Sequence, residues 1–177
     1  MTRRFYSNGK LLLAGEYVIL DGALGLAVPT KFGQSLQASS IHSPQLRWTS
    51  LDEKGEIWFE SSFTLEHYEP IESSDRETAD TLSRILCAAK KGNPRFLETG
   101  HQVETRLGFS RNWGLGSSST LINNIAQWAE IDAHELLWNS FSGSGYDISC
   151  AQHSHPIFYQ LKKRAPIVAK ATFDPTF

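Results

Sequence analysis

The sequence predicts an α+β domain in which strands come first and helices cluster later. Two observations carry this prediction: the first third of the chain holds strand-like segments separated by turn signals, and the apolar residues of segments 79–89 and 121–129 recur at helical spacing. A chain of 177 residues is long enough for one sizeable core and too short for two comfortable ones. We therefore expect one domain over residues 1–177.

Composition and charge are those of an ordinary soluble globular protein. Apolar residues make up 40% of the chain, charged residues 20%, and the formal net charge is −2, which argues against nucleic-acid binding. The apolar runs have the length of strands, so we expect neither a membrane span nor a signal peptide. Cys87 and Cys150 imply no disulfide framework, and we expect two reduced thiols in a cytoplasmic protein.

The N-terminal part of the chain is predicted to form strands. A turn at Asp21-Gly22 follows the first of them, and residues 52–55, Asp-Glu-Lys-Gly, are typical of a hairpin turn between the last two. The expected strands are residues 5–14, 25–28, 32–38, 46–51 and 57–63.

A helix of about four turns is expected next. The polar stretch 69–75 introduces it, and residues 90–92, Lys-Lys-Gly, are typical of a helix end. One face of this helix is apolar and consists of Ala79, Leu82, Ile85, Leu86 and Ala89.

The second half of the chain alternates strands with helices. Val103, Thr105 and Leu107 alternate in a strand over residues 101–107, and Asp132 with Glu135 resembles a capping box. The elements expected after residue 107 are a helix through Glu130, a second helix ending before Ser142, a short helix over 146–151, and strands over 156–161 and 167–173.

Residues 114–120, Gly-Leu-Gly-Ser-Ser-Ser-Thr, form a small-residue loop directly before an amphipathic helix. The first N–H groups of a helix lack partners and carry the positive end of the helix dipole, so this loop can attract phosphate. It matches neither the Walker A loop, because no Lys follows Gly116, nor the dinucleotide fingerprint, because Ser119 stands where the third glycine belongs. Ordinary capping of the helix is the alternative.

Three further features accompany this loop: Lys10 in an apolar strand, Glu16-Tyr17 after Gly15, and Asp147 after the second glycine-rich loop. A purely structural role is the alternative for both Lys10 and Asp147, since a strand lysine can extend its charge to solvent and an aspartate can cap a helix. Together they meet the needs of phosphoryl transfer, which requires a phosphate cradle, a divalent metal, a cation and a carboxylate.

Three segments in this order resemble the motifs of the GHMP small-molecule kinases, named for galactokinase, homoserine kinase, mevalonate kinase and phosphomevalonate kinase. Residues 8–20 (Asn-Gly-Lys-Leu-Leu-Leu-Ala-Gly-Glu-Tyr-Val-Ile-Leu) resemble the opening of the family, 114–118 its phosphate loop, and 143–147 (Gly-Ser-Gly-Tyr-Asp) its aspartate segment. The first and third are most similar to phosphomevalonate kinases, with mevalonate kinases next. The resemblance implies the N-terminal GHMP kinase domain, with helices packed on one face of a mixed sheet.

The resemblance also implies roles for matching residues. Asp147 would be the catalytic base or would orient the acceptor hydroxyl, with Lys10 close to it and to the transferred phosphoryl group. Glu16 and Tyr17 would lie near the acceptor. The ATP phosphates and Mg²⁺ would be bound by the loop residues Gly114, Leu115, Gly116, Ser117, Ser118 and Ser119, with the Ser118 hydroxyl as the metal contact.

The implied activity is transfer of the ATP γ-phosphoryl group to a hydroxyl or phosphate of a small metabolite, with a mevalonate-pathway acceptor favoured by the motifs. No nucleic acid or membrane partner is expected, and a homodimer is left open. A regulatory nucleotide-binding module without catalysis is the main alternative.

The chain departs from the family at several positions. Members usually have proline at the positions of Asn8 and Ser110, so these two loops are less rigid here. Ser119 and Thr120 stand where alanines are common. Mevalonate kinases place a metal-binding Glu eleven residues before the aspartate, and that position is Leu136 here, one residue from Glu135. The sequence therefore assigns no second metal ligand.

Length is the larger departure. These kinases usually have a second, C-terminal domain that closes the active-site cleft, whereas this chain ends at Phe177. We expect that the chain is either a fragment of a two-domain kinase or a departure from the family. We also expect weak or no activity from the 177-residue chain by itself.

Two other functions compete with the kinase prediction. Cys150, His153 and His155 have ligand types that suit zinc, but they lack a fourth ligand and match no common spacing. A serine hydrolase would use Ser118 or Ser144, yet neither lies in a Gly-x-Ser-x-Gly elbow.

Overall fold

The computed structural model describes residues 1–172, and this part of the chain has the predicted α+β composition. Its strands are β1 (Thr2–Ala14), β2 (Gly25–Ser40), β3 (Gln45–Leu51), β4 (Ile57–Thr64), β5 (Pro70–Ser73), β6 (His101–Leu107), β7 (Ile157–Lys162) and β8 (Ala165–Lys170). Its α-helices are α1 (Arg76–Gly92), α2 (Ser117–Ala129), α3 (Ala133–Ser140) and α4 (Tyr146–Gln152).

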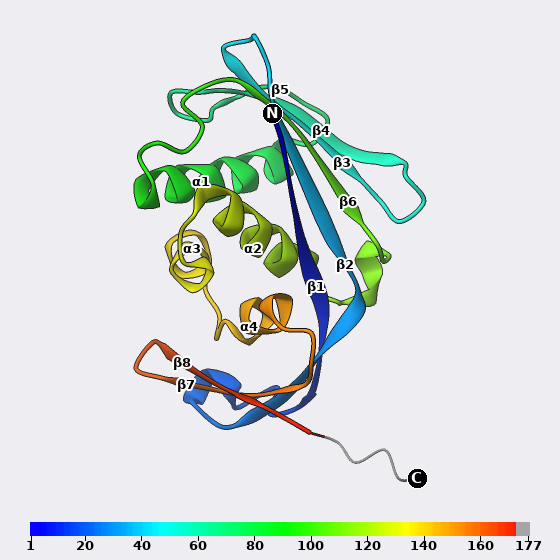
Figure 1. Ribbon diagram of the computed structural model, residues 1–177, viewed down its shortest axis with the longest axis vertical. Helices are drawn as coiled ribbons and strands as arrows, with labels where there is room; N and C mark the ends of the chain where they lie inside the picture. Colours follow the sequence, from blue (N-terminus) through cyan, green and yellow to red (C-terminus); the bar gives the residue numbers. More distant parts are fainter. Residues whose placement is uncertain (173–177) are drawn as a thin grey trace.

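All these strands belong to one mixed sheet. The strand order is β5-β4-β3-β6-β2-β7-β8, and β1 pairs with β2. The β3–β6 pair is parallel and every other pair is antiparallel. Figure 1 shows the four helices together on one side of the sheet, as the sequence led us to expect.

β2 corrects the prediction of two separate strands over 25–28 and 32–38. The strand runs unbroken through Pro29, which lies opposite Lys10, and the register with β1 then shifts before Gly33 pairs with Asn8. A proline has no N–H to donate, so it is tolerated where a strand pair is irregular. The long, irregular β1–β2 pair results, and Lys10 lies at its irregularity.

The local turn and capping predictions are confirmed. The 52–55 hairpin closes with Gly55 N–H donating to the Asp52 carbonyl at 3.2 Å. The Asp75 carboxylate accepts from Thr78 N–H at 2.7 Å and starts α1, and Asp132 accepts from Glu135 N–H at 2.8 Å and starts α3. The predicted apolar face of α1 is buried throughout.

The structure also differs from the prediction at β5, at the end of α2 and at the end of β8. The polar stretch 69–75 contains β5, a short and mostly exposed strand that lacks apolar alternation. α2 ends at Ala129, because Glu130 adopts a left-handed φ of 60°. β8 ends at Lys170, and Phe173 of the predicted strand lies outside the described residues.

The main apolar core fills the space between the sheet and helices α1, α2 and α3. A second, smaller core lies under α4 and consists of Ile19, Ala27, Cys150, Ile157 and Tyr159. The two cores hold α2 and α4 against the same face of the sheet, where both helices contact β1. In residues 1–172 no helix combines the length and the apolar character needed to cross a bilayer.

We predict a pH dependence of stability from His134, which is buried on α3 with its Nε2 3.1 Å from the Ser149 hydroxyl. Burial lowers the pKa of His134, against smaller opposing effects of Asp132, Gly145 and Glu135. The unfolded chain therefore binds a proton more readily, and the free energy of unfolding falls as pH drops below the ordinary histidine value of 6.5. Urea unfolding of His134→Gln at about pH 8 and about pH 5.5 should show a smaller pH difference than wild type.

His67→Gln is the matched control, because the side chain of His67 is 69% exposed. An equal loss of pH dependence in both variants would contradict this prediction.

Candidate active site

The site is built around residues 9 and 10 of β1, which contact the predicted phosphate loop through the backbone. Lys10 N–H donates to the Leu115 carbonyl at 3.0 Å. A Cβ atom on Gly9 would lie 2.9 Å from the Phe32 carbonyl oxygen and 3.1 Å from that of Leu115. Only glycine allows this approach, so Gly9 brings β1, β2 and the loop together.

The loop itself is shorter than the sequence indicated. Residues 114–116 are irregular, and Ser117 to Thr120 already form the first turn of α2. Gly114 and Gly116 have φ values of 69° and 83°, which glycine adopts without strain. No side chain caps α2, in contrast to the aspartate caps of α1 and α3. The positive end of the α2 dipole is therefore available to an anion.

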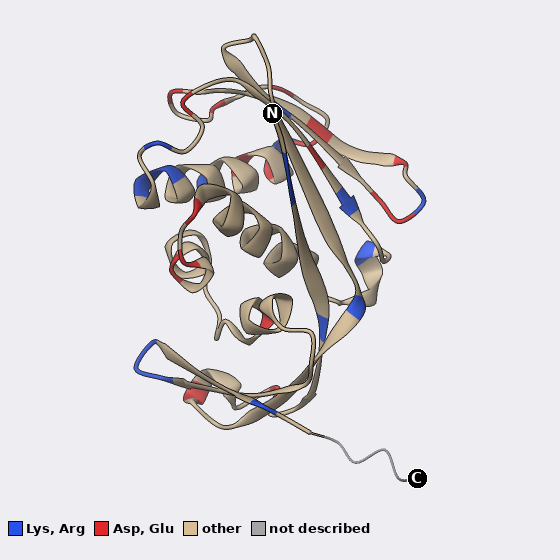
Figure 2. Ribbon diagram, viewed as in Figure 1, with Lys and Arg blue, Asp and Glu red and all other residues tan. Residues whose placement is uncertain are grey.

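Lys10 and Asp147 meet at this point, as the sequence predicted. Lys10 Nζ lies 3.4 Å from Asp147 Oδ1, and the two side chains are only 19% and 29% exposed. Figure 2 shows a red band on α4 next to a blue band on the adjoining part of β1. Asp147 Oδ1 is buried beside the Lys10 ammonium and accepts no hydrogen bond within the described part of the chain, while the exposed part of the carboxylate can accept a proton from a ligand.

The sequence did not identify Tyr146 as part of this site. The Lys10 ammonium lies 5.3 Å from the centre of the Tyr146 ring. Burial lowers the pKa of Lys10, but contact with Tyr146 and the negative charge of Asp147 outweigh it, and the pKa is raised overall. Burial raises the pKa of Tyr146 to about 12, so the phenol stays neutral and Lys10 stays charged.

The second glycine-rich loop holds the first turn of α4 in place. Gly145 has a φ of 83°, and a Cβ atom there would lie 2.8 Å from Cδ2 of His134. The Tyr159 hydroxyl donates to the Ser144 carbonyl, and Trp138 Nε1 donates to the Gly143 carbonyl at 3.1 Å. Loop and helix together fix the position of Asp147.

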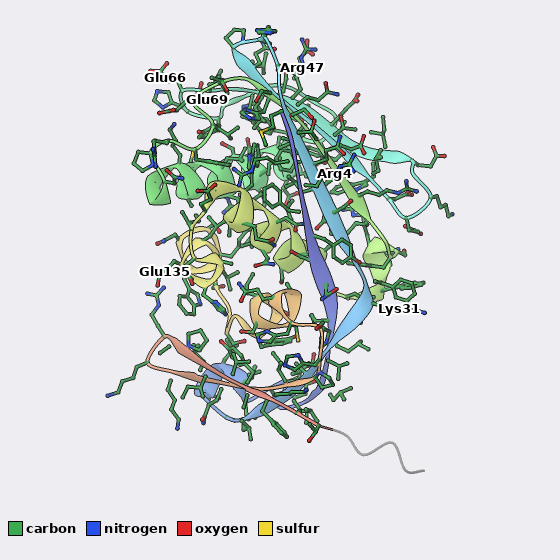
Figure 3. All side chains as sticks on the ribbon, in the orientation of Figure 1. Arg4, Lys31, Arg47, Glu66, Glu69 and Glu135 are labelled. Atoms are coloured by element: carbon green, nitrogen blue, oxygen red, sulfur yellow. The ribbon has the colours of Figure 1, made fainter. Side chains whose placement is uncertain are left out.

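The other predicted residues lie at different distances from this centre. Ser119 Oγ lies 3.8 Å from the position that a Cβ atom on Gly116 would occupy, so the Ser119 side chain lies beside the loop. Ser118 is exposed next to it. Glu16 and Tyr17 are exposed, and their side chains form no hydrogen bond or ion pair within residues 1–172. Figure 3 places Glu135 on the outer side of α3, away from β1, so it supplies no second metal ligand.

A cavity of about 240 Å³ adjoins the first turn of α2 and was not predicted. Ser117 and Ser118 line one part of it and Trp58 another. The Arg111 guanidinium carbon lies 3.7 Å from the centre of the Trp58 ring, and Trp58 Nε1 is buried without a partner in the described residues. Neither residue belongs to a binding motif, so this cavity could not be recognised from the sequence.

Solved structures with the same fold are small-molecule kinases. A Bacteroides thetaiotaomicron D-glycero-D-manno-heptose 1-phosphate kinase matches with a TM-score of 0.73 and 17% identity, over 98% of this chain and 61% of that one. Lactococcus lactis galactokinase, complexed with galactose, matches with a TM-score of 0.69 and 16% identity, over 96% and 47%. The chain has the fold of the GHMP kinases.

A third GHMP kinase structure holds a nucleotide analogue. Streptococcus pneumoniae phosphomevalonate kinase in complex with phosphomevalonate and AMPPNP matches with a TM-score of 0.62 and 18% identity, over 92% of this chain and 50% of that one. The chain thus spans about half the length of the solved GHMP kinases it matches. No protein-family model matches the sequence, and no curated protein does.

The two competing sites do not assemble on this GHMP kinase fold. In residues 1–172 no three His, Cys, Asp or Glu side chains converge on a metal position, and burial raises the pKa of the Cys150 thiol to about 12. The histidine rings that contact serine hydroxyls reach Ser40 and Ser149 rather than Ser118 or Ser144. Zinc binding through Cys150 and serine hydrolysis through Ser118 or Ser144 both lack the required geometry.

We predict that Gly116→Ala weakens the binding of inorganic tripolyphosphate by about tenfold or more. A Cβ atom at this left-handed position would lie 3.3 Å from Cγ of Lys10 and displace either the loop or the lysine. Isothermal titration calorimetry measures the affinity.

Gly55→Ala is the matched control, since Gly55 has a φ of 88° in the β3–β4 hairpin and meets only the end of the Arg106 side chain. Both variants carry the same backbone strain, so an equal loss of affinity would show that the loop is not the anion site.

Proposed function

We propose that this chain binds Mg-ATP and transfers the γ-phosphoryl group to a hydroxyl or phosphate of a small metabolite. One observation carries the proposal: Lys10 contacts the glycine-rich loop through its N–H group and Asp147 through its side chain. Three segments far apart in the sequence thereby place a phosphate cradle, a cation and a carboxylate at one point. The small-molecule kinases that share the fold support this function.

The nucleotide would extend from the loop into the adjoining cavity. The free N–H groups of the first turn of α2 suit the phosphates, and the indole ring of Trp58 suits stacking with a purine base. The AMPPNP bound to the S. pneumoniae enzyme supports ATP as the donor. When bound, Mg²⁺ would neutralise charge on the phosphates, with the Ser118 hydroxyl as its contact on this chain.

Asp147 would act on the acceptor. The exposed part of its carboxylate can accept the proton of an acceptor hydroxyl as the oxygen–phosphorus bond forms and the bond to the departing ADP breaks. Lys10 would pair with the carboxylate and stabilise negative charge on the transferred group. Because Lys10 stays protonated, it contributes charge rather than a proton.

The acceptor class is the least constrained part of the proposal. The matching kinases act on galactose, a heptose phosphate and phosphomevalonate according to their names, so the fold alone selects none of them. We propose a mevalonate-pathway acid, on the motif similarity of residues 8–20 and 143–147 alone, with Glu16 and Tyr17 near it.

Asp147→Asn tests the proposal. The amide cannot accept the proton, so transfer should fall by a factor on the order of 10²–10⁴ while the Kd for Mg-ATP changes by less than about threefold. Transfer is measured on a panel of sugars, mevalonate and phosphomevalonate, and the Kd by calorimetry. Asp80→Asn is the control, because Asp80 pairs with Arg76 on the exposed face of α1.

Three results are informative. Loss of transfer in Asp147→Asn with retained Mg-ATP binding supports the kinase. Mg-ATP binding without transfer to any acceptor, even when a C-terminal GHMP kinase domain is supplied, would favour the regulatory nucleotide-binding module. Absence of Mg-ATP binding would overturn both functions.

A further inference from the structure

A cluster of amide and hydroxyl side chains lies directly beneath the candidate active site, where β1, α2 and α4 meet. We call it the polar junction, and its members are Ser7, Asn123, Asn124 and Gln152. Ser7, Asn123 and Asn124 are at most 1% exposed. Burying so many polar groups costs free energy unless each is hydrogen bonded, so the partners of each side chain determine how the junction is held together.

Asn123 joins α2 to both other elements. Its Nδ2 donates to the Ser7 hydroxyl on β1 at 2.8 Å, and its Oδ1 accepts from Gln152 Nε2 on α4 at 3.1 Å. Gln152 is the last residue of α4, whose first turn carries Asp147. A single side chain thus connects the helix that begins at the phosphate loop to the helix that carries the carboxylate.

Asn124 belongs to the same junction but makes different connections. It accepts from the Ser7 hydroxyl at 2.8 Å, and its Nδ2 donates to the Gln34 carbonyl on β2 at 2.9 Å. It therefore joins α2 to the sheet and forms no hydrogen bond with α4. The two neighbouring asparagines are equally buried, and only Asn123 bonds to α4.

Hydrogen bonds at this junction restrict movement more than apolar contacts would. Apolar side chains can slide over one another at little cost, whereas a buried amide loses its partner after a shift of about 1 Å and is then left unsatisfied. The Ser7 hydroxyl donates to Asn124 and accepts from Asn123 at 2.8 Å, with a second, longer contact from Gln127 Nε2 at 3.5 Å. The junction therefore favours one arrangement of the three elements.

We propose that Asn123 is a positioning residue of the phosphoryl-transfer site and that its bond to Gln152 sets the distance between Asp147 and the first turn of α2. This inference rests on the proposed kinase function. The loop binds the donor and Asp147 binds the acceptor, so a displacement of α4 relative to α2 separates the reacting groups. A misplacement of about 1 Å can cost on the order of 100-fold in rate.

Gln152→Leu is the direct test, because Gln152 lies at the surface and its loss removes the α2–α4 bond without emptying the core. We expect kcat to fall by about tenfold or more while the Kd for Mg-ATP changes by less than about threefold. Gln127→Leu is the matched control, since Gln127 is an exposed glutamine of the same region whose amide reaches β1 only. Its kcat should stay within about twofold of wild type.

Asn123 and Asn124 offer a second comparison, which is more sensitive because both side chains are buried. Asn123→Leu and Asn124→Leu should lose similar amounts of stability, because each leaves Ser7 with one broken bond. Only Asn123→Leu should lower kcat relative to the Kd for Mg-ATP. If neither variant folds, the Gln152 and Gln127 variants decide the question alone.

Hydrogen–deuterium exchange supplies a readout that needs no catalysis. Amides in the peptide covering residues 146–152 should exchange at least about tenfold faster in Gln152→Leu than in wild type or Gln127→Leu, with the β3–β4 hairpin unchanged. Equal exchange of this peptide in Gln152→Leu and Gln127→Leu would overturn the positioning role. Absence of transfer by the wild-type chain, even when a C-terminal GHMP kinase domain is supplied, would instead refute the kinase function and leave the exchange result valid.

Discussion

The site depends on the close contact between β1 and the glycine-rich loop. Lys10 donates its N–H group to Leu115, and Gly9 leaves no room for a Cβ atom between β1, the loop and β2. The irregular pairing of β1 with β2 places Lys10 at this contact with its side chain directed to Asp147. One short piece of strand thus holds the glycine-rich loop by its backbone and the Asp147 carboxylate by its charge.

Charge and capping divide the helices into two kinds. α1 and α3 begin with an aspartate that satisfies their first N–H groups, whereas α2 and α4 begin with glycine and have no side-chain cap. The uncapped helices are the ones that bear the site.

Lys10 and Asp147 are each mostly buried, and each offsets the cost of burying the other's charge. The polar junction beneath them adds directional bonds where an apolar core would allow sliding.

Local signals in the sequence were sufficient for the hairpin at 52–55 and the buried face of α1, whereas the proximity of Lys10 to Asp147 was implied by the resemblance to the GHMP kinases. Local signals failed where long-range pairing decides the structure. Two strands were predicted over 25–28 and 32–38, but Pro29 lies opposite the irregularity of β1 and β2 continues through it. Trp58 and Asn123 follow no motif, because their roles arise only when distant strands and helices meet. Motif residues can be identified from their spacing in the sequence. The buried residues that hold them in position, such as Asn123, cannot.

The central claim is that the contact of β1 with the loop creates the nucleotide site. Its most direct test is the Kd for Mg-ATP of Gly9→Ala, measured by calorimetry on protein shown to be folded by circular dichroism. A Cβ atom 3.1 Å from the Leu115 carbonyl oxygen forces the loop away from β1, so affinity should fall by at least about tenfold. A folded Gly9→Ala variant that binds Mg-ATP within about twofold of wild type would contradict the account.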